Sequence, residues 1–341
     1  MEIIVPAAGL SSRFPGMKPK YLLYDYSHKL MLQRALAPYK GHNVTIGILK
    51  EHDDKYNAVD FIRHEFGEDI TIVVLDKPTN GPADTVYQIL CQSGIEPCRE
   101  FLIKDCDSFF DHELTSGNYI CVSDISEHEV LNRLGSKSFV ISNEQGVITN
   151  IIEKKVVSNK FCVGGYKFQS VGEYLENFES ISTEKEIFVS DVISMMLQKG
   201  RIFTEKPVIN YTDVGTAQEW FKYNDKPVIF CDIDGTIIIA QSRVGKNTLD
   251  DPAIALDKNV VRLLEYQNNG AQFIFTTARP KSYTDVTHTL LVDLGFKNYQ
   301  LIMGLQNARR ILINDYNKSN PHPRATAINI ERNADNLSNF L

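Results

Sequence analysis

Two aspartates, two residues apart, follow a short apolar run in the last third of the chain. Asp232 and Asp234 stand directly after Val228–Cys231 and before Gly235 and Thr236. A carboxylate at Asp232 can attack phosphorus as a nucleophile, and Asp234 can protonate the leaving alcohol and then activate water. Gly235 frees the turn, and Thr236 can cap the segment that follows. Residues of these types at this spacing are chemically suited to phosphate-ester hydrolysis.

The segment resembles the DxDGT signature of the haloacid-dehalogenase superfamily, and later segments resemble the remaining motifs of that superfamily in the same order. Within Phe275–Pro280, which ends a predicted strand, the resemblance implies that Thr277 binds the phosphate, with Thr276 as the alternative if the register shifts by one residue. It also implies a phosphate-stabilising cation at Arg310, or else at Arg309.

The same resemblance implies a Mg²⁺ site in this half of the chain. Asp315 would complete that site with Asp232 and the main-chain carbonyl of Asp234, and Asn314 stands where many members of the superfamily carry a second acid. This half has no room for a large cap domain. The polar insertion Ile239–Leu256 is therefore the segment that we expect to act as a small lid.

A second group of chemically suited residues follows the first apolar strand of the chain. Small residues after a strand let backbone N–H groups approach a polyphosphate, and basic side chains neutralise the charge that those dipoles cannot. Both kinds of residue occur in the loop that follows Ile3–Pro6, namely Ala8, Gly9, Ser11, Arg13 and Lys20. The combination predicts a binding site for a polyphosphate.

These residues resemble the AAGxxSR…PKxL opening of the sugar-phosphate nucleotidyltransferases, particularly the cytidylyltransferases and related pyrophosphorylases. The resemblance implies that Ala8, Gly9, Ser11, Arg13 and Lys20 hold the triphosphate of an incoming NTP, with Arg13 and Lys20 as the catalytic cations. The later segment Asn80–Thr85 resembles the part of the family that reads the base. There, nucleotide contacts are implied for Asn80, Gly81 and Ala83.

Three further aspartates fit a metal site in the first half. Asp105 and Asp107 follow an apolar strand, and residues i and i+2 face the same side of a strand, so both carboxylates could reach one divalent cation. The family resemblance places its metal aspartate at Asp107 and a second metal carboxylate at Asp213, which begins Asp213–Thr216. We therefore expect Mg²⁺ as the cofactor.

An acceptor site is implied by two more resemblances. Glu153 and Lys154 resemble the EKP segment of the family, although Lys155 stands where the family has proline. Gly164 and Gly165 belong to a stretch that resembles the VGxY segment. The resemblance implies that Lys154 binds the phosphate of a sugar or polyol acceptor and that the two glycines allow its ring or chain to pack closely.

The resemblance also implies a mechanism without a covalent protein intermediate. The acceptor phosphate attacks the α-phosphorus of the NTP in line, and pyrophosphate leaves. Catalysis then comes mainly from positioning and charge neutralisation. CTP is favoured because the opening motif is most like that of the cytidylyltransferases, and UTP, dTTP and GTP stay open.

The elements that must position these residues follow from the hydrophobic pattern. Short β-branched runs alternate with amphipathic stretches, at Ile3–Pro6, Val44–Leu49, 54–66, Ile70–Leu75, 82–93 and Phe101–Ile103. This alternation predicts βαβ units and a mostly parallel sheet. Later strand-like runs suggest antiparallel additions, at Ser138–Ser142, Val147–Glu153 and Phe161–Phe168. We expect an α/β, Rossmann-like nucleotidyltransferase domain with a mixed sheet over residues 1–224.

The pattern restarts after the polar turn Asn224–Pro227. Strands are predicted at Val228–Cys231, Gln272–Phe275, Gln300–Met303 and Ile311–Ile313, and helices near 257–269 and 281–294. We expect a small Rossmannoid domain of the haloacid-dehalogenase type, with a minimal cap, over residues 227–341.

Composition restricts the class of protein. The chain has 341 residues, enough for two domains with separate cores. Its net charge of −7 disfavours a general nucleic-acid or anionic-membrane surface. The six cysteines form no CxxC pair, the N-terminus does not resemble a signal peptide, and no apolar run is long enough to span a bilayer. We expect a cytoplasmic protein, and a homo-oligomer is compatible with these features.

The chain as a whole predicts a bifunctional enzyme. One domain would activate a sugar or polyol phosphate as its nucleoside diphosphate derivative, and the other would remove a phosphate in the same pathway, in the synthesis of precursors for surface or capsular polysaccharide. Two alternatives stay open: a single catalytic domain with the other as a scaffold, and a non-catalytic sensor of sugar nucleotides.

Overall fold

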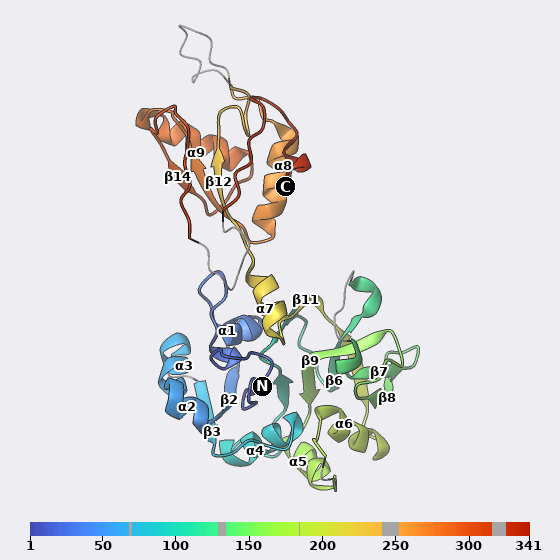
Figure 1. Ribbon diagram of the computed structural model, residues 1–341. Helices are drawn as coiled ribbons and strands as arrows, with labels where there is room; N and C mark the ends of the chain where they lie inside the picture. The colour runs from blue at the N-terminus through green and yellow to red at the C-terminus, as the bar shows by residue number, and fades with distance from the viewer. Residues whose placement is uncertain (68–69, 129–133, 184, 241–251, 316–324) are drawn as a thin grey trace. The chain divides into compact units, whose positions relative to one another are not determined.

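The computed structural model describes the chain except for residues 68–69, 129–133, 184, 241–251 and 316–324 (Figure 1). The chain divides into two compact units, Met1–Asn224 and Asp225–Leu341. Among the described residues, no helix combines the length and apolar character needed to cross a membrane.

The first unit is built on a nine-stranded mixed sheet. Four neighbouring strands at one side of the sheet run parallel, in the spatial order β4 (Phe101–Lys104), β1 (Glu2–Pro6), β2 (Asn43–Leu49) and β3 (Ile70–Leu75). Ile3, Ile4 and Val5 are all fully buried. A continuous apolar run of this kind is typical of a parallel strand that is covered on both faces.

Antiparallel strands extend the sheet beyond β4. The long strand β9 (Lys160–Phe168) lies between β4 and β6 (Asn118–Asp124) and runs antiparallel to both. The remaining strands are β10 (Phe203–Pro207), which is parallel to β6, and the hairpin of β7 (Phe139–Ser142) and β8 (Ile148–Ile152). The predicted mixed sheet, with antiparallel strands in its later part, is confirmed.

Helices cover both faces of this sheet (Figure 1). Ile4 packs with the apolar sides of α4 (Pro82–Ser93), α5 (Val171–Glu179) and α6 (Val189–Gln198). Ile3 and Val5 pack on the opposite face with α1 (Met31–Leu36) and α3 (Ala58–Phe66). The unit also contains α2 (Lys50–Tyr56), α7 (Ala217–Asn224) and short 3-10 helices at Lys20–Leu22, Ala37–Tyr39, Ile125–Glu127 and Leu134–Ser136.

A small two-stranded sheet joins distant parts of the first unit. Its strands are β5 (Ser108–Asp111), directly after the turn that follows β4, and β11 (Ile209–Asp213). The antiparallel register sets Asp213 opposite Ser108, and the amide of Val214 donates to the carbonyl oxygen of Asp107 at 3.0 Å. This pairing brings Asp213 to the turn that contains Asp107.

The second unit contains a three-stranded parallel sheet. The order is β12 (Val228–Asp232), β13 (Gln272–Thr276) and β14 (Gln300–Ile302). Its helices are α8 (Asp257–Asn268), α9 (Thr284–Asp293) and short 3-10 turns at Lys281–Tyr283 and Leu337–Asn339. The predicted strand and helix positions up to residue 302 agree with these bounds to within a few residues.

The strand predicted over Ile311–Ile313 is wrong. The part of the chain described after Ile302 contains no further strand, and these three side chains are exposed by 69%, 53% and 89%. An apolar run between polar neighbours has the composition of a strand, but a strand forms only where a sheet edge accepts its hydrogen bonds. The lid predicted over Ile239–Leu256 falls mainly on residues 241–251, which lie outside the described residues.

A buried asparagine ties the turn after β12 to the end of the chain. Asn259, at the start of α8, has no exposed surface. Its side-chain amide donates to the carbonyl oxygens of Thr236 and Ala334, each at 2.8 Å, and its carbonyl oxygen accepts from the amide of Leu337 at 2.8 Å. One side chain therefore satisfies three backbone groups, of which the Leu337 amide is buried.

We predict that Asn259→Ala destabilises the second unit by about 3 kcal/mol, because it removes three side-chain hydrogen bonds and leaves the buried Leu337 amide without this partner. Chemical unfolding followed by circular dichroism would measure the change, with Asn268→Ala, an exposed position at the end of the same helix, as the control. Equal stability of the two variants would contradict this role of Asn259.

Candidate active site

A cavity of about 610 Å³ opens in the first unit beside the segments that follow β1 and β4. The carboxyl ends of parallel strands are where ligands bind in open α/β sheets. Most residues predicted from the sequence for this unit line the cavity: Ala8, Gly9, Ser11, Arg13, Lys20, Gly81, Asp105, Asp107, Glu153, Lys154, Gly164 and Asp213.

Three predicted residues lie outside the cavity wall. The side chain of Asn80 is turned to the backbone, where its amide donates to the carbonyl oxygen of Lys185 at 2.9 Å. Ala83 is fully buried in the first turn of α4. Gly165 faces the core, since a Cβ there would lie 2.8 Å from the ring of Phe110.

Gly81 packs closely against the backbone of another segment of the protein. Its φ is +106°, and a Cβ at this position would lie 2.5 Å from the carbonyl oxygen of Ile187. Backbone hydrogen bonds join the same two segments, from Ile187 to Asn80 at 2.9 Å and from Ala83 to Ile187 at 3.1 Å. The need for glycine here therefore follows from the packing of residues 80–83 against residues 185–187.

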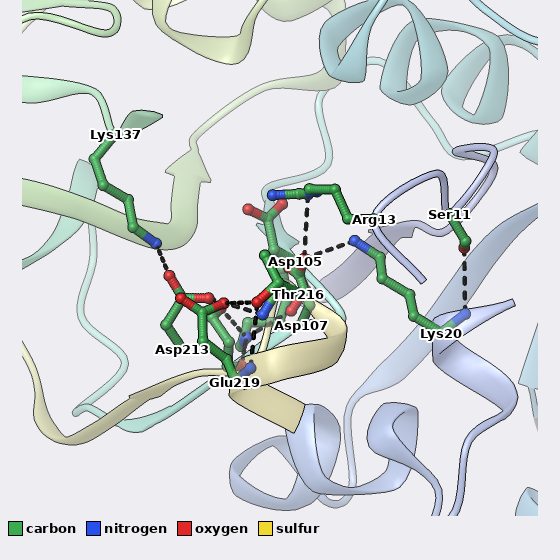
Figure 2. A network of polar contacts seen from close by, with 12 residues as sticks. Ser11, Arg13, Lys20, Asp105, Asp107, Lys137, Asp213, Thr216 and Glu219 are labelled. Atoms are coloured by element: carbon green, nitrogen blue, oxygen red, sulfur yellow. Dashed lines mark hydrogen bonds and ion pairs between the residues drawn. The ribbon is translucent and has the colours of Figure 1, made fainter. Parts of the chain in front are cut away.

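The basic residues of the first loop converge on Asp107. The ammonium of Lys20 donates to Asp107 Oδ2 at 2.6 Å, and the guanidinium of Arg13 lies 3.6 Å from the same atom. The backbone amide of Lys20 also donates to Ser11 Oγ at 3.2 Å, which ties the two halves of the loop together. Figure 2 shows Arg13 and Lys20 reaching the carboxylates from one side.

Lys20 and Asp107 stabilise each other's charged forms. Burial alone would raise the pKa of Asp107, but the nearby Lys20 ammonium and its hydrogen bond hold that pKa well below its usual range. Burial would likewise lower the pKa of Lys20, and the charge of Asp107 outweighs this effect and raises it. The pair is therefore ionised at neutral pH.

The carboxylates of Asp107 and Asp213 both lie beside Gly215. A Cβ added to Gly215 would lie 3.0 Å from Asp107 Oδ2 and 3.0 Å from Asp213 Oδ1. The amide of Gly215 also donates to Asp213 Oδ1 at 2.9 Å. The missing side chain at Gly215 leaves room for the two carboxylates to approach each other.

Asp105 has a different environment from Asp107. Strand β4 ends at Lys104, so the argument from strand alternation does not apply to the aspartates that follow. A Cβ at Gly164 would lie 2.5 Å from Asp105 Oδ2, and the amide of Asp105 donates to the Gly164 carbonyl oxygen at 2.8 Å. Burial, assisted by the charge of Asp107, raises the pKa of Asp105 to about 6.

A buried lysine holds the turn that contains these aspartates. Lys104 has no exposed surface, and its ammonium donates to the carbonyl oxygens of Asp105 at 2.7 Å and Ser108 at 2.6 Å. Burial lowers the pKa of Lys104 to about 8. Its ammonium, with three donors, therefore fixes both ends of the turn from the core. The sequence analysis assigned Lys104 no role.

The carboxylates of Asp107 and Asp213 suit Mg²⁺. In the described part of the chain, no three His, Cys, Asp or Glu side chains form a complete metal cage. Mg²⁺ is usually held by one or two carboxylates, with nucleotide phosphates and waters completing the octahedron. The convergence of two carboxylate oxygens on Gly215 therefore fits this ion, and Asp107 and Asp213 would hold it.

Lys137 is a cavity residue that the sequence analysis did not identify. Its ammonium contacts Asp213 Oδ2 and donates to Tyr211 Oη at 2.9 Å. Burial would lower the pKa of Lys137, but Tyr211 and Asp213 raise it above its usual value. A single lysine ahead of a strand has no distinguishing pattern, so only the tertiary structure reveals its position.

Lys154 and Glu153 lie on another wall of the cavity. Glu153 accepts hydrogen bonds from the hydroxyls of Ser138 and of Ser190, the latter at 2.7 Å. The ammonium of Lys154 lies 4.0 Å from the centre of the Phe188 ring and 3.8 Å from Glu186 Oε2. Lys154 itself has φ +54°, a left-handed conformation that turns the chain after β8.

A second polar cluster lies at the end of β12 in the second unit. The guanidinium of Arg310 donates to Asp232 Oδ1 at 3.1 Å. Burial raises the pKa of Asp232, and Arg310 opposes that shift. The hydroxyl of Thr277 donates to Asp234 Oδ2 at 3.1 Å. The structure therefore brings together four of the residues predicted for this site.

Arg279 completes this cluster, although the sequence analysis gave it no role. Its Nη2 and Nε donate to the two oxygens of Asp234 at 2.8 and 3.0 Å, a bidentate pairing. The position of Arg279 two residues after Thr277, ahead of Pro280, was the available signal.

Asp315 is an exposed residue after the run Ile311–Ile313.

Comparisons with solved structures identify the fold of the first two thirds of the chain. The structure is similar to a nucleoside-diphosphate-sugar pyrophosphorylase from Vibrio cholerae RC9, with a TM-score of 0.55 and 19% identity over 64% of this chain and 98% of the other. It is also similar to the inositol-1-phosphate CTP transferase from T. maritima, with a TM-score of 0.53 and 19% identity over 64% of this chain and 90% of the other.

A third similar structure is a UDP-glucose pyrophosphorylase complexed with UDP-glucose, with a TM-score of 0.50 and 17% identity over 65% of this chain and 95% of the other. No family model matches the sequence, and no curated protein matches it. About 65% of the chain thus has the fold of the sugar-phosphate nucleotidyltransferases, and a small parallel sheet follows it.

Proposed function

We propose that residues 1–224 transfer a nucleotidyl group from an NTP to a phosphorylated sugar or polyol and release pyrophosphate. The observation that carries this proposal is the meeting of Asp107 and Asp213 at Gly215, with Lys20 and Arg13 beside them on the cavity wall. A carboxylate pair next to phosphate-binding cations is the arrangement that a metal-dependent attack on a nucleotide needs.

The transfer is a single in-line displacement. An oxygen of the acceptor phosphate forms a bond to the α-phosphorus, and the bond from that phosphorus to the bridging oxygen breaks. Pyrophosphate leaves with the electron pair, and Arg13 and Lys20 neutralise its charge. Mg²⁺, held by Asp107 and Asp213, supplies further charge neutralisation when bound. The loop from Ala8 to Ser11 provides backbone amides for the phosphates.

CTP is our first choice of nucleotide and a polyol or sugar phosphate our choice of acceptor. The opening motif and the fold shared with an inositol-1-phosphate CTP transferase support both choices. UTP is the next candidate, because a UDP-glucose pyrophosphorylase shares the fold as well. The wall formed by Glu153 and Lys154 would face the acceptor, with Glu153 accepting hydrogen bonds from its hydroxyls.

For residues 227–341 we propose a phosphatase of the haloacid-dehalogenase type. Asp232 would attack the phosphorus of a phosphomonoester, and the bond to the alcohol oxygen would break as Asp234 gives it a proton. Water then attacks the aspartyl-phosphate, Asp234 takes a proton from it, and inorganic phosphate leaves. The Asp232–Arg310 contact supports this proposal, because it places a cation beside the nucleophile, where it could also meet a substrate phosphate.

The two activities together suit a pathway that makes precursors of a surface or capsular polysaccharide. A screen of the intact protein with CTP, UTP, dTTP and GTP against a panel of sugar and polyol phosphates tests this scheme, with pyrophosphate and inorganic phosphate recorded separately. Release of only one product would favour a single catalytic unit, and release of neither would favour a sensor.

We predict that Asp107→Asn and Asp213→Asn each lower the rate of pyrophosphate release on the order of a thousandfold, because each removes a metal-holding charge. Phosphate release by the second unit should persist. A coupled pyrophosphate assay would measure the effect, with Asp111→Asn as the control, since this exposed carboxylate of β5 bonds to Asn210 outside the cavity lining. Normal turnover in either cavity variant would refute the assignment.

We predict that Asp232→Asn abolishes release of inorganic phosphate and leaves pyrophosphate release unchanged, because an amide cannot act as the nucleophile. A malachite-green assay would follow the product, and Asp285→Asn, an exposed carboxylate in the first turn of α9, is the matched control. Retained phosphatase activity would identify a different nucleophile. Loss of both activities with the fold intact would contradict two separate sites.

A further inference from the structure

The carboxylate pair of the first unit has a lysine on each side. Lys20 contacts Asp107, and Lys137 contacts Asp213. In the view of Figure 2, Lys137 approaches from the side opposite to Lys20 and Arg13. The two lysines come from distant parts of the sequence, one from the loop after β1 and the other from the segment before β7.

In-line displacement gives these two sides different tasks. The attacking and leaving oxygens lie on opposite sides of the α-phosphorus, so the cations that hold them must do so as well. Arg13 and Lys20 belong to the loop that would hold the leaving pyrophosphate. Lys137 lies on the other side of the carboxylates. It is therefore on the side from which the acceptor phosphate must come.

We propose that Lys137 binds the attacking phosphate of the acceptor and exchanges its contact with Asp213 for that phosphate when the metal ion is held by Asp107 and Asp213. This inference rests on the nucleotidyl transfer proposed above and adds a residue to it. A metal ion at Asp213 Oδ1 competes with the ammonium, which contacts Asp213 Oδ2, for the charge of the same carboxylate. This competition weakens the ion pair and frees the ammonium to pair with a phosphate.

The backbone around Lys137 is fixed well enough for this task. Its carbonyl oxygen accepts from the amide of Lys154 at 3.0 Å, and the neighbouring Ser138 carbonyl accepts from the amide of Cys162 at 2.8 Å. The side chain is 19% exposed, so it reaches the cavity from a packed position. Tyr211 Oη lies 2.9 Å from the ammonium. It would stay hydrogen-bonded to Lys137 while the phosphate replaces the contact with Asp213.

Lys154 is less suited to bind the attacking oxygen. Its side chain is half-exposed, and its ammonium lies on the Phe188 ring near Glu186. These contacts place the charge on the wall that would face the body of the acceptor. We therefore assign the phosphate to Lys137 and the sugar or polyol portion to the wall of Lys154 and Glu153.

The test compares Lys137→Met, Lys137→Arg and, as a control, Lys160→Met. Lys160 is also ion-paired, with Glu205 at 2.5 Å, and lies outside the cavity lining. Binding of Mn²⁺ alone is followed by electron paramagnetic resonance. Binding of inorganic phosphate is followed by calorimetry in the presence of Mn²⁺ and the non-reacting α,β-methylene analogue of CTP, which fills the nucleotide site. Transfer kinetics are measured with the best acceptor from the screen.

In Lys137→Met we expect Mn²⁺ to bind several-fold more tightly, because a competing charge is gone, and inorganic phosphate to bind at least about tenfold more weakly. The KM for the acceptor should rise by a similar factor, while the KM for the NTP stays within about twofold. Lys137→Arg should recover much of the phosphate binding, since it retains the charge. A purely structural role would not move metal and phosphate affinity in opposite directions.

The proposal is overturned if Lys137→Met binds inorganic phosphate as the wild type and Lys160→Met do, or if the wild type binds no phosphate beside the analogue. Weaker Mn²⁺ binding in Lys137→Met would also overturn it. If the wild type transfers no nucleotide to any acceptor, the proposed function of the unit fails. The phosphate and Mn²⁺ titrations then still decide whether Lys137 is an anion-binding residue.

Discussion

The antiparallel pairing of β5 with β11 is the constraint on which the proposed chemistry of the first unit depends. It sets Asp213 opposite Ser108 and so places two carboxylates on either side of Gly215. Like charges that are buried close together raise the free energy of the folded state unless cations balance them. Lys20 and Lys137 supply that balance, one for each carboxylate, and a bound metal ion would take over part of it.

The neighbouring residues follow from the same requirement. Lys104 holds the turn after β4 from within the core, so the position of Asp107 does not depend on its contact with Lys20 alone. Gly164 and Gly215 lack side chains where Asp105 and the carboxylate pair need space. A cavity lined by carboxylates and by lysines paired with them is suited to exchange lysine contacts for metal and phosphate contacts.

Motifs with a fixed spacing could be predicted from the sequence, and contacts made by tertiary structure could not. The loop from Ala8 to Lys20 and the parallel order of the first strands follow from local pattern. Lys137 was not identified, because a single lysine ahead of a strand has no distinguishing pattern. Gly81 packs against the backbone of Ile187, a contact between segments that are distant in the sequence. In the second unit, Ile311–Ile313 has the composition of a strand, yet β14 is the last strand in the part of the chain that the structure describes.

In the function proposed here, Asp107 and Asp213, brought together by β5 and β11, hold the metal ion on which nucleotidyl transfer depends. Anomalous X-ray scattering from crystals grown with Mn²⁺ and the α,β-methylene analogue of CTP tests it most directly. We expect an anomalous peak bonded to both carboxylates and to the α-phosphate of the analogue, with Lys137 withdrawn from Asp213. A peak held by Asp105 without Asp213, or a nucleotide bound with the Lys137–Asp213 contact unchanged, would contradict it.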